Sequence, residues 1–169
     1  GCLMAQMIVR AMAAEDIEQV SLIHNRVFVR QGRSREWVES NFRAFPRMRY
    51  FVALDEGRLE GYIHWTERSG FREKVVLELE QLGVTPERQG QGIGRRLVLE
   101  SLPLVSKAIA GRGAAIRHIV VTTRADNAAQ RLYRTVLGAE IEATIPRLYS
   151  ADEVFMIARD VDLEVVLGH

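Results

Sequence analysis

The stretch that decides the fold runs from Leu82 to Leu97 and reads LGVTPERQGQGIGRRL. A β-rich apolar run that starts at Val75 stops at Pro86, glycines then alternate with other residues, and a helical apolar pattern begins at Ile93. Glycine lets a backbone approach a ligand closely. The first N–H groups of a helix have no partners within the helix and lie at the positive end of its dipole. The pattern therefore predicts a strand, an anion-binding turn and a helix, a combination suited to a pyrophosphate.

Three phosphate-binding motifs compete for this turn. A dinucleotide-binding GxGxxG motif needs glycine where Arg95 stands, and a Walker loop needs a terminal Gly-Lys-Ser/Thr that the stretch lacks. The pattern Gln/Arg-x-x-Gly-x-Gly/Ala is matched by Gln89, Gly92 and Gly94, with Arg88 and Arg95 adding positive charge. A glycine-rich turn that only reverses the chain is the alternative interpretation.

A second motif follows the apolar strand that is predicted to end at Thr123. It reads NAAQRLY from Asn127 to Tyr133, and Gly138 and Ala139 come after it. Together, and in this order, the two motifs resemble those of the Gcn5-related N-acetyltransferase (GNAT) superfamily, whose members bind acetyl-CoA. The order of the expected strands and helices resembles that of the family over residues 7–158. The sequence motifs specific to the family lie within residues 82–139.

The hydrophobic patterning predicts an α/β or α+β fold in one domain. Strands are expected at 7–10, 50–54, 59–66, 75–85, 116–123, 139–144 and 153–158, and helices at 14–28, 34–45, 93–110 and 127–137. Ser34 is a candidate helix N-cap, Gly57 a turn residue with positive φ, and Pro103 predicts a kink or two short helices. About four helices should flank a mixed sheet of about six to seven strands. The resemblance adds a V-shaped splay between the fourth and fifth strands.

Length and charge narrow the class of protein. The chain has 169 residues, 47% of them hydrophobic, and a net charge of +1, so disorder and strong attraction to nucleic acid or membrane are disfavoured. The single cysteine, Cys2, fits a reducing cytoplasm. The acetyltransferase domain is expected over 7–160, after a terminus (1–6) that is disordered or left from cloning and before a C-terminal tail (161–169). A homodimer is left open.

The resemblance implies a binding site for acetyl-CoA as co-substrate. The pantetheine would pair with backbone groups near Leu82 and Val84, and the pyrophosphate would rest on amides from Gln89 to Gly94. Asn127 would bond the pantetheine and Tyr133 would face the thioester sulfur. The full expected set is Leu82, Gly83, Val84, Arg88, Gln89, Gly90, Gln91, Gly92, Ile93, Gly94, Arg95, Asn127 and Tyr133.

The implied reaction is direct acetyl transfer to a primary amine, with Tyr133 as the general acid for the leaving thiolate. Glu78 and Glu80 share one face of the long strand, and either could accept the amine proton, directly or through water. The alternative is that both are solvated and pair with Lys74 or Arg72. Further candidates are His24, His64 and His118, no two of which have metal-ligand spacing, so no metal is expected.

Other interpretations stay open at this stage. The chain could be a non-catalytic acyl-CoA sensor or regulatory module, or a transferase for another acyl group. The acceptor could be a small molecule or a peptide or protein amine. The segment carrying Arg26, Arg30, Arg33 and Arg35 would attract a carboxylate or phosphate on the acceptor, unless it is an ordinary solvated loop.

Overall fold

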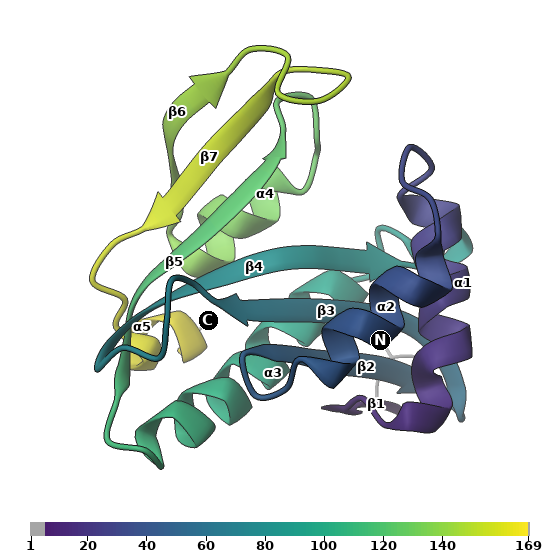
Figure 1. The fold of residues 1–169 in the computed structure, drawn as a ribbon, viewed down its shortest axis with the longest axis horizontal. Coiled ribbons are helices and arrows are strands. Elements are labelled where there is room, and N and C mark those ends of the chain that lie inside the picture. The colour runs from purple at the N-terminus through teal and green to yellow at the C-terminus, as the bar shows by residue number, and fades with distance from the viewer. Residues whose placement is uncertain (1–5, 169) are drawn as a thin grey trace. The chain divides into compact units, whose positions relative to one another are not determined.

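The computed structural model describes residues 6–168, so most of the expected disordered terminus lies outside the described residues. Within them, strands are hydrogen-bonded in the order β1-β2-β3-β4-β5-β7-β6, a seven-stranded mixed sheet as predicted (Figure 1). The strands are β1 (Met7–Ala11), β2 (Met48–Asp55), β3 (Arg58–Glu67), β4 (Lys74–Val84), β5 (Ala115–Arg124), β6 (Glu140–Ile145) and β7 (Glu153–Ala158).

Helices connect these strands. The α-helices are α1 (Ile17–Val27), α2 (Ser34–Arg43), α3 (Ile93–Ala110), α4 (Gln130–Leu132) and α5 (Leu163–Leu167). Short 3-10 turns, η2 (Ala14–Asp16) and η3 (Pro86–Arg88), precede α1 and α3, and a π-helical segment, η4 (Tyr133–Leu137), continues α4. The chain forms two compact units, one reaching to Thr66 and including 81–105, the other containing 67–80 and the residues from 106 onward.

The N-terminal unit is built on the antiparallel pairs β1–β2 and β2–β3. The hairpin between β2 and β3 turns at Glu56 and Gly57, whose φ values of 51° and 80° confirm the predicted positive φ. Helices α1 and α2 cover one face of these strands and bury Val20, Val38 and Tyr62 completely. The amino-terminal part of α3 covers the other face, where Trp65 donates a hydrogen bond to the Ser101 hydroxyl over 2.8 Å.

The C-terminal unit contains the antiparallel ladders β5–β7 and β6–β7, which lie side by side in Figure 1. Its parallel ladder joins β4 to β5 from Lys74 opposite Ala115 to Glu78 opposite Val120. Both strands continue beyond that last pair, β4 to Val84 and β5 to Arg124. The ladder therefore ends where the predicted splay between the fourth and fifth strands would begin.

Two predicted helix features are wrong. Helix α3 continues through Pro103, so the alternative of two short helices is wrong; Leu102 and Val105 are completely buried on either side, and their packing outweighs one lost backbone hydrogen bond. Ser34 is the first residue of α2 rather than its N-cap, which is Arg33 with φ 52°. The Ser34 hydroxyl instead lies 2.7 Å from Nδ1 of His24.

Three predicted boundaries also change. The helix expected over 14–28 is split, since the Asp16 carboxylate accepts hydrogen bonds from Arg10 and from the amide of Ala13 and holds a 3-10 turn before α1. The helix expected from Asn127 begins only at Gln130 and soon becomes π-helical, ending as predicted at Gly138 with φ 73°. The expected C-terminal tail contains α5, which the Asp162 carboxylate caps.

Candidate functional site

The loop between β4 and α3 has the geometry of an anion-binding turn. Gly90 and Gly92 have φ values of 78° and 87°, and a Cβ added to either would meet no atom within 4 Å. The amides of Gly92, Ile93 and Gly94 donate no hydrogen bond within residues 6–168, since the first such bond into α3 runs from Arg96 to the Gly92 carbonyl over 3.1 Å. Unused donors at the start of a long helix can bind a phosphate.

The Arg88 guanidinium, expected near the pyrophosphate, is paired with carboxylates in this structure. It lies 3.0 Å from the Asp55 carboxylate and 3.7 Å from that of Glu60, and it donates to the Gln91 side chain over 2.9 Å. Two carboxylates already balance its charge. Arg88 therefore ties the glycine-rich loop to the β2–β3 hairpin, and sequence reasoning missed Asp55 and Glu60 because they lie far from the motif.

The carboxyl end of β4 presents two peptide groups on one edge. The amide of Thr85 donates to the Glu60 carbonyl on β3 over 2.8 Å. The backbone N–H and C=O groups of successive residues face alternate edges of a strand. Those of Leu82 and Val84 therefore face the edge opposite to β3. The Val84 carbonyl accepts a hydrogen bond of 3.1 Å from the Gln89 side chain, which joins this strand end to the loop.

Gly83 is required by packing rather than by backbone conformation. A Cβ at this position would lie 2.8 Å from the ring of Tyr62, closer than real Cβ contacts come. The same contact places Gly83 on the α1–α2 face of the sheet, so its neighbours Leu82 and Val84 direct their side chains to the other face.

The two candidate bases, Glu78 and Glu80, lie on one face of β4 as predicted, and both are half-buried. The Glu78 carboxylate pairs with Arg68 at 3.4 Å. The Arg72 side chain donates to the Ser69 carbonyl. Glu78 therefore has a counterion from the end of the β3–β4 hairpin that sequence reasoning did not assign.

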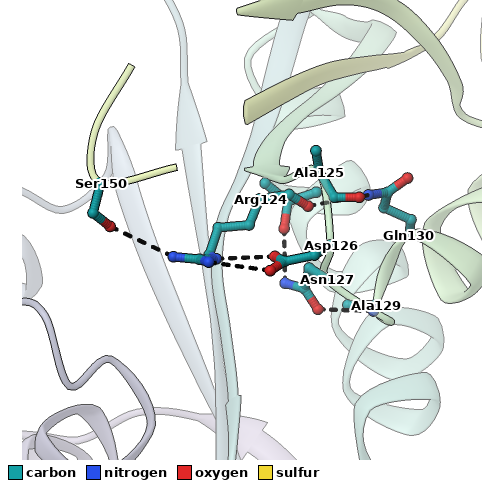
Figure 2. Close-up of polar contacts among 8 residues, drawn as sticks. Arg124, Ala125, Asp126, Asn127, Ala129, Gln130 and Ser150 are labelled. Carbon is teal, nitrogen blue, oxygen red and sulfur yellow. Dashed lines mark hydrogen bonds and ion pairs between the residues drawn. The ribbon is translucent and has the colours of Figure 1, made fainter. Parts of the chain in front are cut away.

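Asn127 holds the turn between β5 and α4 (Figure 2). Its Nδ2 donates to the Thr123 hydroxyl over 2.7 Å, and its Oδ1 accepts from the Ala129 amide over 2.9 Å. Gln130 donates to the carbonyls of Arg124 and Ala125 over 3.0 and 2.8 Å. Thr123 and Gln130, which sequence reasoning did not select, thus fix the turn with Asn127.

Arg124 extends this cluster toward the β6–β7 loop. Its guanidinium makes a bidentate contact with Asp126, at 3.0 and 3.1 Å, and reaches the Ser150 hydroxyl at 3.5 Å, as Figure 2 shows. The amide of Ala125 donates to the Asp152 carbonyl over 2.9 Å. The end of β5 is therefore anchored on both sides.

Tyr133 is buried in the π-helical segment, and 5% of its surface is exposed. Burial raises the pKa of its hydroxyl to about 12, because the phenolate would lose its hydration. The hydroxyl makes no hydrogen bond to any residue in the described part of the chain. Tyr133 is thus a protonated phenol at neutral pH with its donor unused.

Within residues 6–168, no group of three or more histidine, cysteine or acidic side chains is arranged to hold a metal ion. None of the helices in that part of the chain combines the length and the hydropathy needed to cross a membrane.

The fold and the β4–α3 loop together define an acyl-CoA N-acyltransferase architecture: a mixed seven-stranded sheet, a parallel β4–β5 ladder and a glycine-rich turn with unused amides after β4. The chain belongs to the acetyltransferase (GNAT) family, whose family model matches residues 16–139. The expected superfamily is therefore confirmed, and so is its fold class.

Among curated relatives, the chain is 33% identical over 115 residues to mycothiol acetyltransferase of Amycolatopsis mediterranei, covering 65% of this chain and 34% of that protein. It is 37% identical over 90 residues to mycothiol acetyltransferase of Rothia mucilaginosa, covering 51% and 25%. The chain thus spans about a third or less of these relatives' lengths. Among solved structures, yncA of Salmonella typhimurium with its cofactor acetyl-CoA matches with TM-score 0.69 and 20% identity, over 91% of this chain and 94% of that one.

Proposed function

We propose that this chain, as one domain over residues 7–160, transfers the acetyl group of acetyl-CoA directly to a primary amine in a ternary complex. The observation that supports this most is in the N-terminal unit. The unused amides of Gly92 to Gly94 follow a strand end whose Leu82 and Val84 peptide groups face away from β3. A diphosphate on those amides, with a pantetheine extended along β4, uses both sets of backbone groups.

The basic residues of the loop divide into two roles. Arg88 positions the loop through Asp55 and Glu60. We assign Arg95, in the first turn of α3, to the diphosphate, whose charge it would balance beside the helix dipole. From the C-terminal unit, the family pattern assigns Asn127 to the pantetheine and Tyr133 to the thioester sulfur.

In the chemical step the amine nitrogen attacks the thioester carbonyl, the C–N bond forms and the C–S bond breaks. A backbone N–H near Leu82 would stabilise the tetrahedral oxyanion. The Tyr133 hydroxyl would give its proton to the departing thiolate, and its high pKa keeps that proton in place until transfer. Holding both substrates together supplies much of the rate enhancement through proximity.

Either Glu78 or Glu80 takes the amine proton, directly or through water. An amine with a pKa of about 10.4 costs about 4.6 kcal/mol to deprotonate at pH 7, whereas an α-amine near 7.8 costs about 1 kcal/mol. The Glu78 carboxylate also faces Arg68 at 3.4 Å, so Glu78→Gln and Glu80→Gln are assayed separately. The base is the residue whose substitution shifts the pH dependence of turnover when the acceptor amine has a high pKa.

The proposal is tested by calorimetric titration with acetyl-CoA and by CoA release over a panel of amines. Binding accompanied by turnover of at least one amine supports it. Binding without turnover of any amine would favour the acyl-CoA sensor, and faster turnover with propionyl-CoA or succinyl-CoA would favour another acyl group. Absence of binding to CoA and to its acylated forms would refute the assignment.

A further inference from the structure

Several polar side chains are buried on the α1–α2 face of the N-terminal unit and are connected to one another. His24 and Tyr62 are completely buried, and Gln81 is 6% exposed. His24 and Gln81 both contact Gln31, an exposed residue of the α1–α2 loop, and Tyr62 joins them through Gln81. Burying this many polar groups costs free energy that an apolar packing would avoid, so the arrangement calls for a functional explanation.

One donor sets the direction of every hydrogen bond in this group. The Trp37 indole N–H can only donate, and it lies 3.3 Å from Oε1 of Gln81, which also accepts from the Tyr62 hydroxyl at 3.0 Å. The amide Nε2 of Gln81 must then face Gln31, whose Oε1 accepts from it over 3.1 Å. The atom of Gln31 held in this contact is therefore its carbonyl oxygen.

The same oxygen determines the tautomer of His24. Nε2 of His24 lies 2.8 Å from Oε1 of Gln31, so Nε2 carries the proton and donates. Nδ1 is then the acceptor for the Ser34 hydroxyl at 2.7 Å. Burial lowers the pKa of His24, which keeps the ring neutral. With its lone pair occupied, His24 positions Gln31 and is not the general base.

Gln31 is consequently an oriented hydrogen-bond donor. Its carbonyl oxygen accepts from two buried groups, which holds the carboxamide in one orientation. Its NH2 group donates to nothing within residues 6–168, and the residue is exposed. An amide held this way presents two N–H donors at a point one side chain away from Gln81, the neighbour of Leu82.

The charges of the surrounding segment also select among ligands. Arg26, Arg33 and Arg35 are paired with Glu87, Glu36 and Glu18, so their charges are balanced. Among the arginines of this segment that the structure describes, Arg30 has no carboxylate partner. Of the positive charges expected to attract anions to this segment, that of Arg30, next to Gln31 in the sequence, is therefore the one left without a carboxylate among the described arginines.

We propose that Gln31 is an acceptor-binding residue that donates to a carbonyl or carboxylate oxygen next to the reacting amine. The acceptor is then an amino acid derivative or a peptide N-terminus, rather than a simple alkylamine or polyamine. This inference rests on the proposed acetyl transfer, whose co-substrate binds elsewhere in the N-terminal unit.

The decisive variant is Gln31→Glu, which keeps an oxygen for His24 and Gln81 and removes the outward NH2. Acetylation of alaninamide and of propylamine is compared, since the first has the oxygen and the second lacks it. We expect kcat/KM for alaninamide to fall roughly tenfold, the effect of one lost hydrogen bond, and that for propylamine to change less than twofold. Arg33→Gln, in the same loop, is the matched control and should alter neither.

Equal losses for both acceptors would overturn the inference, because Gln31 would then be only structural. A second readout does not need acetyl-CoA: the Gln31 side-chain NH2 resonances should shift on titration with alaninamide and not with propylamine. Shifts without any acetyl-CoA binding would refute the proposed acetyl transfer, and with it the acceptor role, and leave only the hydrogen bond from Gln31 to the ligand oxygen standing. Identical responses to the two amines would refute the Gln31 assignment alone.

Discussion

The Arg88 guanidinium lies 3.0 Å from the Asp55 carboxylate, across a separation of 33 residues in the chain. This contact, together with the one to Glu60 at 3.7 Å, makes Arg88 part of the scaffold under the glycine-rich loop. The side chains of Arg88, Asp55 and Glu60 are 21%, 16% and 8% exposed, so water screens these charges only weakly.

Arg88→Met should therefore lower the free energy of unfolding, measured by urea denaturation, by about 3 kcal/mol, because the poorly hydrated Asp55 carboxylate loses its counterion, whereas Glu60 keeps its contact with Arg58 at 3.7 Å. Adding Asp55→Asn to the Arg88→Met protein should restore part of that loss. Unchanged stability in the single variant would show that the pairing contributes little.

Gly92→Val should abolish acetyl-CoA binding in calorimetry, since the branched side chain would occupy the space in front of the α3 amides. Gly57→Val is the matched control: Gly57 has φ 80° and open space around it, as Gly92 has with φ 87°. Both variants should be strained by roughly 1–2 kcal/mol, and only Gly92→Val should lose the co-substrate. Retained affinity in Gly92→Val would argue against the phosphate-binding turn.

Tyr133→Phe should lower turnover about a hundredfold and leave acetyl-CoA affinity nearly unchanged, because the ring still packs while the proton donor is gone. With a pKa of about 12, Tyr133 keeps its proton up to roughly pH 11, so its ionisation should cause no loss of rate between pH 7 and 10. Tyr149→Phe, at a tyrosine that is 74% exposed, serves as the control. A wild-type rate in Tyr133→Phe would remove this residue as the acid.

His64 should make the protein less stable in acid. It is completely buried and stacks on Tyr50 at 4.2 Å, and burial lowers its pKa to about 3. The folded state binds the proton less readily than the unfolded state, whose histidine titrates near 6.5. The stabilisation that neutral His64 contributes is therefore complete above pH 6.5 and is lost as pH falls toward 3. The free energy of unfolding should decrease over this range by up to about 1.4 kcal/mol per pH unit.

The check is the free energy of unfolding of wild type and His64→Phe between pH 7 and 4. Phenylalanine keeps the stacking on Tyr50 and removes the titration, so the variant should show a shallower dependence on pH. Parallel curves for the two proteins would mean that another group accounts for the acid sensitivity.

Much of the fold followed from local rules that act over a few residues. The strand, turn and helix around Gly92, the hairpin turn at Gly57 and the helix end at Gly138 were all predicted, because periodicity and positive φ are properties of short segments. The same kind of rule predicted a kink or two short helices at Pro103, and a division into two helices is absent, since burial along α3 outweighs the local cost of proline.

By itself, the sequence determined the element order, the glycine-rich turn and the family motifs, all of which are written in consecutive residues. Only the tertiary structure decided which charges are balanced and which donors are left over. Arg88 meets Asp55, Glu78 meets Arg68, and Gln81 meets Gln31 across 50 residues, through sheet register and helix packing. Such partners depend on how strands align and helices pack, and no spacing along the chain encodes that alignment.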